Sequence, residues 1–184
     1  MILDLIESTD KIRIAFQKNN LFKLRQLSND LIEESALSSD KLKAQLSLIA
    51  YSLQKLISKP HIVEAQKWSK IKNSVDSSLK KALILLKKKD LNGFEKELDN
   101  ISVKVLEVDS SLGYYVANVY EKAKLKQASR AYAFGLSLRQ SASLTETNEK
   151  DLLNYIGATK IHDREKDVKG IAERKKLLEG IFVE

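Results

Sequence analysis

Residues 39–60 read SDKLKAQLSLIAYSLQKLISKP, and this stretch decides the fold class. Its apolar side chains recur every three or four positions, which is the spacing of an amphipathic α-helix. Serine and aspartate favour a helix start, and a proline disfavours helical backbone at the residue before it. The stretch therefore predicts a helix that opens at Ser39-Asp40 and stops before Pro60. Its buried stripe would be Leu42, Leu46, Ile49, Leu53 and Ile57.

The same spacing extends in both directions along the chain. It predicts further scaffold helices over about 3–18, 21–36, 60–89, 94–108 and 110–134, with a turn at 90–93. Asn19 or Asn20 would cap the second helix, Ser110 or Ser111 would cap the last, and Trp68 would be buried in the long one. Glycine and proline are scarce, at six and one in 184 residues. We therefore expect an all-α fold, either a multi-helix bundle or stacked three-helix units, with a small C-terminal helix-turn-helix unit.

A faint internal repeat supports the stacked arrangement. At an offset of about 70 residues, Ile14, Leu21, Leu24, Leu31, Leu42, Leu46 and Ile49 fall on Ile84, Leu91, Phe94, Ile101, Leu112, Val116 and Val119. The turn at Ser39-Asp40 falls on Asp109-Ser110. Two stacked three-helix units would produce this pattern, and helix periodicity alone would produce much of it.

The composition limits the compartment and the partner. The chain has no cysteine, so disulfides and thiolate metal sites are excluded. No apolar run approaches the roughly 18 residues of a membrane span, and the amphipathic, acidic start is unlike a signal peptide. We therefore expect a soluble cytoplasmic protein that does not enter a membrane.

The net charge of +7 is concentrated in the middle of the chain. Residues 1–59 carry 9 basic and 7 acidic groups, residues 60–130 carry 14 and 9, and the last 54 residues carry 9 of each. A basic excess favours polyanions through counterion release. A lysine-rich, solvated helix surface would give the same counts, so the two interpretations stand side by side.

Composition changes at Gly135, and we place a boundary there between a helical scaffold over 1–134 and a unit over 135–184. A helix-turn-helix needs a small residue where its two helices meet, and Ala142 supplies it. Asn148 is placed to cap the second helix and Gly157 to end it. The residues with the spacing of apolar anchors are Leu138, Leu144, Leu152, Tyr155 and Ile156.

The predicted second helix presents a mixed set of side chains to a duplex. Lys150 and Asn154 are the candidates for contact with bases or backbone, whereas Glu149 and Asp151 would face phosphates. Glu146 stands where many such turns carry a glycine at positive φ. DNA reading, protein docking and a purely structural role all remain open for this unit.

The segment also carries a family pattern. It consists of AYAFGLSL at 131–138, then Ala142 and Leu144-Thr145, then LLNYIG at 152–157. This pattern resembles the helix-turn-helix of small archaeal antitoxin-like proteins over about 50 residues. The resemblance implies a PIN-domain ribonuclease as partner, engaged by a charged segment that follows the helix-turn-helix. The candidate contacts in this chain are Lys160, Arg164, Arg174, Lys175 and Lys176.

A basic ridge is predicted just before this unit. Lys122, Lys126 and Arg130 are spaced by four and share a helix face, with Tyr115 and Tyr120 nearby. Together with Arg139, they could capture a nucleic-acid backbone while a tyrosine ring stacks on a base. The alternative is that the tyrosines pack in the core and the basic side chains are simply solvated.

Catalytic and metal-binding patterns are weak. The two histidines, His61 and His162, have no partner at metal-ligand spacing, and the chain has no glycine-rich phosphate loop. We therefore expect a non-enzymatic binding protein without cofactor, which is antitoxin-like or transcription-regulator-like and binds DNA in preference to RNA. The alternative is an RNA- or ribosome-associated scaffold that uses the basic middle helices.

Overall fold

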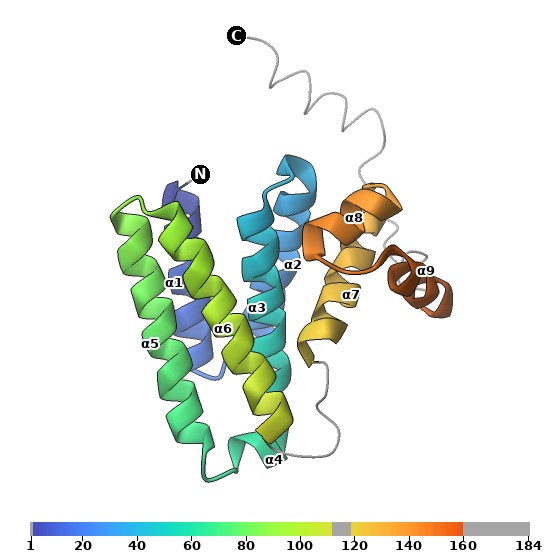
Figure 1. Cartoon of the computed structure of the whole chain (residues 1–184). Helices are drawn as coiled ribbons and strands as arrows, with labels where there is room; N and C mark the ends of the chain where they lie inside the picture. Colours follow the sequence, from blue (N-terminus) through green and yellow to red (C-terminus); the bar gives the residue numbers. More distant parts are fainter. Residues whose placement is uncertain (1, 112–118, 160–184) are drawn as a thin grey trace.

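A computed structural model describes residues 2–111 and 119–159, without the side chains of 109–111. This part of the chain contains helices and no strand, so the all-α prediction is confirmed. The helices are α1 (Ile2–Gln17), α2 (Leu21–Ser38), α3 (Lys41–Ile57), α4 (Pro60–Val63), α5 (Trp68–Lys87), α6 (Leu91–Ser111), α7 (Val119–Ala133), α8 (Leu138–Thr145) and α9 (Glu149–Ala158) (Figure 1).

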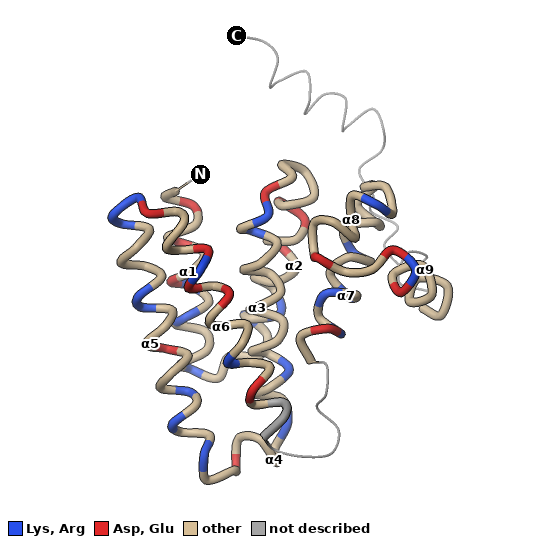
Figure 2. Tube along the Cα trace, in the orientation of Figure 1, with Lys and Arg blue, Asp and Glu red and all other residues tan. Residues whose placement is uncertain are grey.

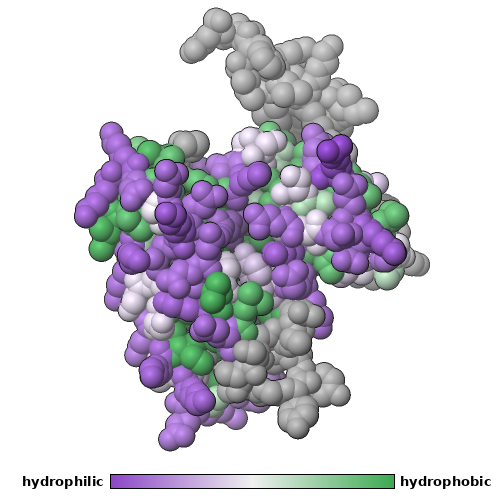
Figure 3. All heavy atoms as spheres, in the orientation of Figure 1, coloured by the Kyte–Doolittle hydropathy of each residue, from purple (hydrophilic) through white to green (hydrophobic). Residues whose placement is uncertain are grey.

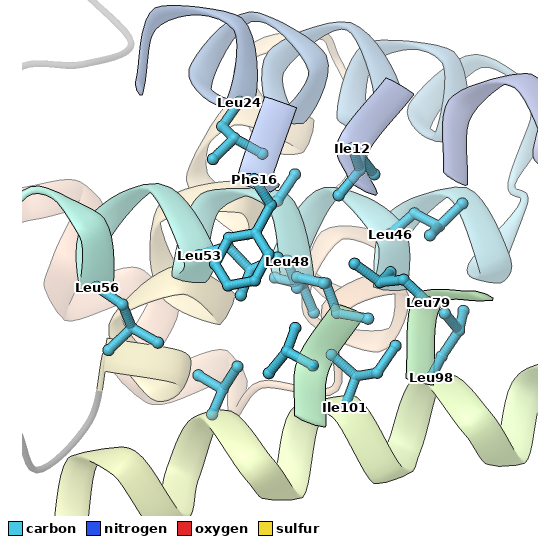
Figure 4. Packing of buried hydrophobic residues seen from close by; sticks show 14 of the residues in the cluster. Ile12, Phe16, Leu24, Leu46, Leu48, Leu53, Leu56, Leu79, Leu98 and Ile101 are labelled. Carbon is cyan, nitrogen blue, oxygen red and sulfur yellow. The ribbon is translucent and has the colours of Figure 1, made fainter. Parts of the chain in front are cut away.

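Helix α3 lies at the centre, with α1, α2, α6, α7 and α8 packed around it. Its apolar stripe is the predicted one: Ile49 is fully buried, as are Leu46 and Leu53, which Figure 4 shows in the core. Asp40 caps the helix, because its carboxylate accepts the backbone N–H groups of the first turn. Each fully buried leucine or isoleucine stabilises the fold by about 1.5–3 kcal/mol, so this stripe holds the surrounding helices together.

Helices α1 and α2 form a hairpin that is repeated by α5 and α6. Each of ten buried positions in the first hairpin has a buried counterpart 70 residues later. The pairs join Leu5, Thr9, Ile12, Phe16, Leu24, Leu27, Ser28, Leu31, Ile32 and Ser35 to Val75, Leu79, Ala82, Leu86, Phe94, Glu97, Leu98, Ile101, Ser102 and Val105. The repeat is therefore confirmed for the two helices of each hairpin.

The turns of the two hairpins also match. Asn19 and Lys89, at equivalent positions, both adopt left-handed backbone, with φ of 51° and 60°. One residue further, the Asn20 side chain accepts the N–H of Lys23 at 2.9 Å, and Asp90 accepts that of Gly93 at 2.8 Å. The same backbone path and the same cap therefore start α2 and α6.

The repeat does not extend to the third helix as predicted. Ser39-Asp40 is a turn, whereas its counterpart Asp109-Ser110 lies inside α6, which continues through Ser111. The predicted cap at Ser110 or Ser111 is therefore wrong. Leu112 and Val116 lie outside the described residues.

The prediction of one long helix from Pro60 is also wrong, because the structure has two helices there. Pro60 begins the four-residue α4, a turn follows, and α5 begins at Trp68. Trp68 is buried as predicted and packs edge-on against Phe16, with ring centroids 6.2 Å apart. The ring therefore packs into the core from the first residue of α5.

A buried polar network ties α7 to the scaffold. Gln127 donates its side-chain N–H to the Ser28 hydroxyl at 2.7 Å. Ser28 and Ser47 in turn donate their hydroxyls to each other's carbonyl groups, at 2.9 and 2.7 Å. All three residues are fully buried, so these hydrogen bonds fix α7 in register against α2 and α3.

Candidate nucleic-acid interface

Helices α7, α8 and α9 form a three-helix unit at one side of the bundle (Figure 1). Ala142 of α8 is 2% exposed and lies against Ala128 of α7 and Leu152 and Ile156 of α9. A larger side chain at position 142 would push these helices apart. The two helices and the small buried residue that the helix-turn-helix prediction requires are therefore present.

The turn between α8 and α9 has a left-handed residue although glycine is absent there. Glu146 adopts left-handed backbone (φ 53°, ψ 43°), the position that many such turns give to glycine. The next residue, Thr147, donates its N–H to the carbonyl of Ala142 at 3.0 Å and so closes the end of α8. Glu146 therefore holds a strained backbone to make the turn.

The start of α9 is as predicted, and its end is not. The Asn148 side chain accepts the N–H groups of Lys150 and Asp151, at 2.8 and 3.4 Å. Gly157 was predicted to end the helix but lies inside it, and α9 continues to Ala158. The exposed position of Gly157 needs no left-handed turn, and space is open where a Cβ would stand.

Helix α8 is docked onto the scaffold as well as onto α7. Its start is held by a capping box in which Ser137 and Gln140 exchange hydrogen bonds, and Gly135 turns the chain with a φ of 96°. Leu144 then packs into an apolar cluster with residues of α2, α3 and α7, namely Ile32, Ala36, Ala44 and Ala131. Because α7 contributes to this cluster and to the one around Ala142, the two predicted parts of the chain share a helix.

Two of the predicted cations lie together on this unit. Arg139 of α8 and Lys150 of α9 are both exposed and line one groove, and Glu149 is the acid among its other lining residues, which are Ala142, Ser143, Thr147 and Asn148. Asn154 is exposed one turn further along α9, beside Leu153, which is 58% exposed. Glu149 and Asp151 are exposed as well, so the α9 surface carries two carboxylates for one lysine.

A cation that the sequence did not indicate lies on the other side of α8. Lys41 begins α3 and lines a second groove together with Arg139, Gln140 and Ser143. The scaffold therefore extends the polar face of the helix-turn-helix unit. Lys41 lies 98 positions from Arg139 in the sequence, so no local pattern could have joined the two.

The basic ridge of α7 is not part of this face. Lys122 is exposed, whereas Lys126 and Arg130 are half-buried, and the Arg130 guanidinium lies 6.0 Å from the centre of the Phe134 ring. Successive residues of an α-helix are rotated by about 100° around its axis. On α7, the ridge side chains therefore point roughly 130° away from Leu125 and Ala128, which contact α8 and α9. The ridge therefore points away from the side of α7 that contacts α8 and α9.

The tyrosine of the ridge is a core residue. Tyr120 is 7% exposed, and burial raises the pKa of its hydroxyl to about 12, although a hydrogen bond from Ser102 at 2.9 Å opposes the shift. A buried ring cannot stack on a base, so the predicted stacking role is wrong for Tyr120. Tyr115 lies outside the described residues, as do Lys160, Arg164, Arg174, Lys175 and Lys176.

Comparison with protein-family models, with curated proteins and with solved structures found no match for this chain. Within the described residues, no helix is long and apolar enough to cross a membrane. Over the same residues, no group of three or more histidine, aspartate or glutamate side chains is arranged to hold a metal ion.

Proposed function

We propose that the chain is a cytoplasmic, non-enzymatic protein that binds duplex DNA through α8 and α9. The observation that supports this most directly is the packing of Ala142 against Ala128, with Glu146 making the turn between the two helices. That arrangement presents the second helix of the pair to the major groove in proteins of this kind. The proposed role is that of an antitoxin-like or transcription-regulator-like protein.

The proposed contacts follow from exposure and side-chain chemistry. Arg139 and Lys150 line one groove and would contact phosphates next to the start of the inserted α9. Asn154 is exposed on α9, and its amide can pair with the edge of an adenine. Glu149 and Asp151 would repel phosphates, so we expect the unit to bind weakly without a further contribution.

A protein partner could supply that contribution. The charged segment from Lys160 onward would bind it, and the resemblance to antitoxin-like proteins points to a PIN-domain ribonuclease. Co-purification of such a ribonuclease with the wild-type chain, and its loss on joint replacement of Arg174, Lys175 and Lys176 by glutamate, would support this role. If the wild type and the triple glutamate variant capture the ribonuclease equally, these tail residues do not bind it.

The DNA-binding proposal is tested by charge reversal at matched positions. We expect Lys150→Glu to weaken duplex binding in a salt-titrated assay of the purified chain and to abolish any preference for one duplex sequence over another. Lys122→Glu makes the same change of net charge on the α7 ridge, away from α8 and α9, and serves as the control. A larger loss of duplex affinity with Lys122→Glu would indicate that the duplex binds to the α7 ridge. Unchanged duplex binding with Lys150→Glu would contradict the proposal.

A further inference from the structure

Helix α5 and its flanking residues carry the whole net charge of the protein. Residues 65–89 contain eight lysines and one acid, which gives +7, the same as the complete chain. The remaining sequence is therefore neutral, with 24 basic and 24 acidic residues. Figure 2 shows the lysines spread along the length of α5, which lies at the edge of the bundle. A charge this localised is a surface property of one helix.

The acid of this segment does not offset the exposed lysines at the surface. Asp76 is 8% exposed and faces α1, where it accepts a hydrogen bond from Gln17 at 2.7 Å and lies 3.6 Å from the Arg13 guanidinium. Lys80 completes its contacts at 2.8 Å. The outer face of α5 therefore presents lysines and no carboxylate of its own. Hydrophilic residues dominate the edge of the molecule that α5 forms (Figure 3).

The lysines at the two ends of α5 differ from those at its middle. Lys80 and Lys81 pair with the buried carboxylates of Asp76 and Glu97. Lys67 and Lys70 at one end, and the run from Lys87 to Lys89 at the other, form no ion pair within the described residues. The unpaired cations thus form two end clusters on one straight helix.

The first cluster borders a groove between α5 and α6. Lys67, Lys70 and Lys104 line it together with Ser74, and Glu107 is the acid among its lining residues. Lys104 is held in place, because its ammonium group donates to the Ser78 hydroxyl at 2.5 Å and to the Ser74 carbonyl at 3.3 Å. Three lysines therefore converge where α5 begins.

The distance between the two lysine clusters favours a polymer over a small molecule as the ligand. Eighteen residues separate Lys70 from Lys88, which is about 27 Å along an α-helix. A free phosphate or a mononucleotide cannot reach both clusters, whereas a rigid polyanion can. The side chains between them are small and polar, including Asn73, Ser74 and Ser77.

The side chains on the outer face of α5 favour a duplex over a membrane surface or a single strand. Ile84, at 53% exposure, is its one large exposed apolar side chain, so α5 exposes none of the Trp, Phe and Leu that amphipathic helices insert into membranes. Its tryptophan is buried, so no ring is available to stack on the bases of a single strand. It has no arginine, the residue that most often reads guanine edges, so its contacts would be point charges on phosphate.

We propose that α5, with Lys67, Lys70 and Lys87–Lys89, is a second surface that binds the phosphate backbone of double-stranded nucleic acid without reading its sequence. It is independent of the contacts proposed for α8 and α9. A protein with both surfaces would hold a duplex generally through α5 while the helix-turn-helix unit samples its sequence.

The test compares two triple variants of the full chain. In one, Lys70, Lys87 and Lys88 become glutamine, and in the matched control Arg139, Lys150 and Lys122 become glutamine. All six side chains are exposed, and Lys80 and Lys81 are left in place because they pair with buried carboxylates. Binding to duplexes of random sequence is measured against salt. Each lost phosphate contact lowers the slope of log affinity against log salt by about 1, so the α5 variant should lose about 3.

The control variant should keep most of its affinity for random duplexes, since α5 is intact. DNA and RNA duplexes should respond alike, because both offer phosphates at the surface. An unchanged salt slope in the α5 variant would overturn the proposal, as would tighter binding to single strands or to anionic vesicles than to duplex. Failure of the helix-turn-helix proposal would be seen separately, as a sequence preference that is the same in the control variant as in the wild type, and it would leave the α5 effect unchanged.

Discussion

At the scale of single residues, Glu146 carries the largest local cost in the candidate interface. Left-handed backbone costs an ordinary residue about 1–2 kcal/mol, and glycine adopts it freely. We expect Glu146→Gly to raise the free energy of unfolding by up to about 1 kcal/mol, because glycine also loses more entropy on folding. Urea unfolding measures the change.

Glu146→Ala is the matched control, since it removes the carboxylate and keeps a Cβ at positive φ. It should give no such gain. If alanine stabilises the chain as much as glycine does, the effect comes from the charge of Glu146 and not from its backbone.

At the scale of elements, a buried carboxylate links α5 to α6. Glu97 is 4% exposed, and burial alone would raise its pKa. Hydrogen bonds from Lys81, Ser78 and Asn100 and the charge of Lys81 outweigh burial and hold the pKa of Glu97 below its ordinary value of 4.5. The ionised form therefore favours folding at neutral pH, and this contribution is lost as the pH falls through the lowered pKa.

Replacement by glutamine tests this linkage. Glu97→Gln should lower the free energy of unfolding by about 1–3 kcal/mol at neutral pH, the range for hydrogen bonds to a charged group. The difference from wild type should shrink toward zero below the lowered pKa, where Glu97 itself is protonated. Urea unfolding across the acid range measures both. Glu95→Gln changes an exposed neighbour and should have little effect, and a pH-independent loss for Glu97→Gln would contradict the interpretation.

Most elements could be predicted because their signals are local. The caps at Asn20, Asp40 and Asn148 are each read within three residues of the helix that they start. The break before Trp68 could not be predicted, because residues 64–67 contain neither glycine nor proline and the cause is the distant contact with Phe16. The end of α6 was missed for the opposite reason, since serine at 110 and 111 resembles a cap but lies inside the helix.

At the scale of the whole molecule, the scaffold and the helix-turn-helix unit should unfold together. Leu144 of α8 is 8% exposed and packs on α2 and α3, and α7 belongs to both parts. Leu144→Ala should therefore cost about 2–4 kcal/mol and shift the whole transition. The single tryptophan, Trp68, lies in the scaffold, so its fluorescence midpoint in urea should move as far as the helical signal.

Leu153→Ala, at a side chain that is 58% exposed, should change stability by less than about 0.5 kcal/mol and serves as the control. A helical signal that falls early while the Trp68 transition stays in place would show instead two independent units.

The two helices and the turn of the candidate interface could be predicted from the sequence, but the cations that share its surface could not. Ala142 and Asn148 identify the helix-turn-helix because their roles depend on neighbours along the chain. Which cations share a face depends on how helices pack, so the sequence grouped Lys122 with Lys150 and did not indicate Lys41. The concentration of charge on α5 was visible in the sequence, but burial of Asp76 is a tertiary property.

The matched turns at Asn19 and Lys89 bear on how the chain reaches its native state. Each closes a hairpin of neighbouring helices, so each can form through contacts that are local in sequence and therefore fast. The two turns use the same backbone path, so the turns alone favour neither hairpin as the nucleus. We therefore expect two places where folding can start, and damage to one turn should redirect the folding route and not remove it.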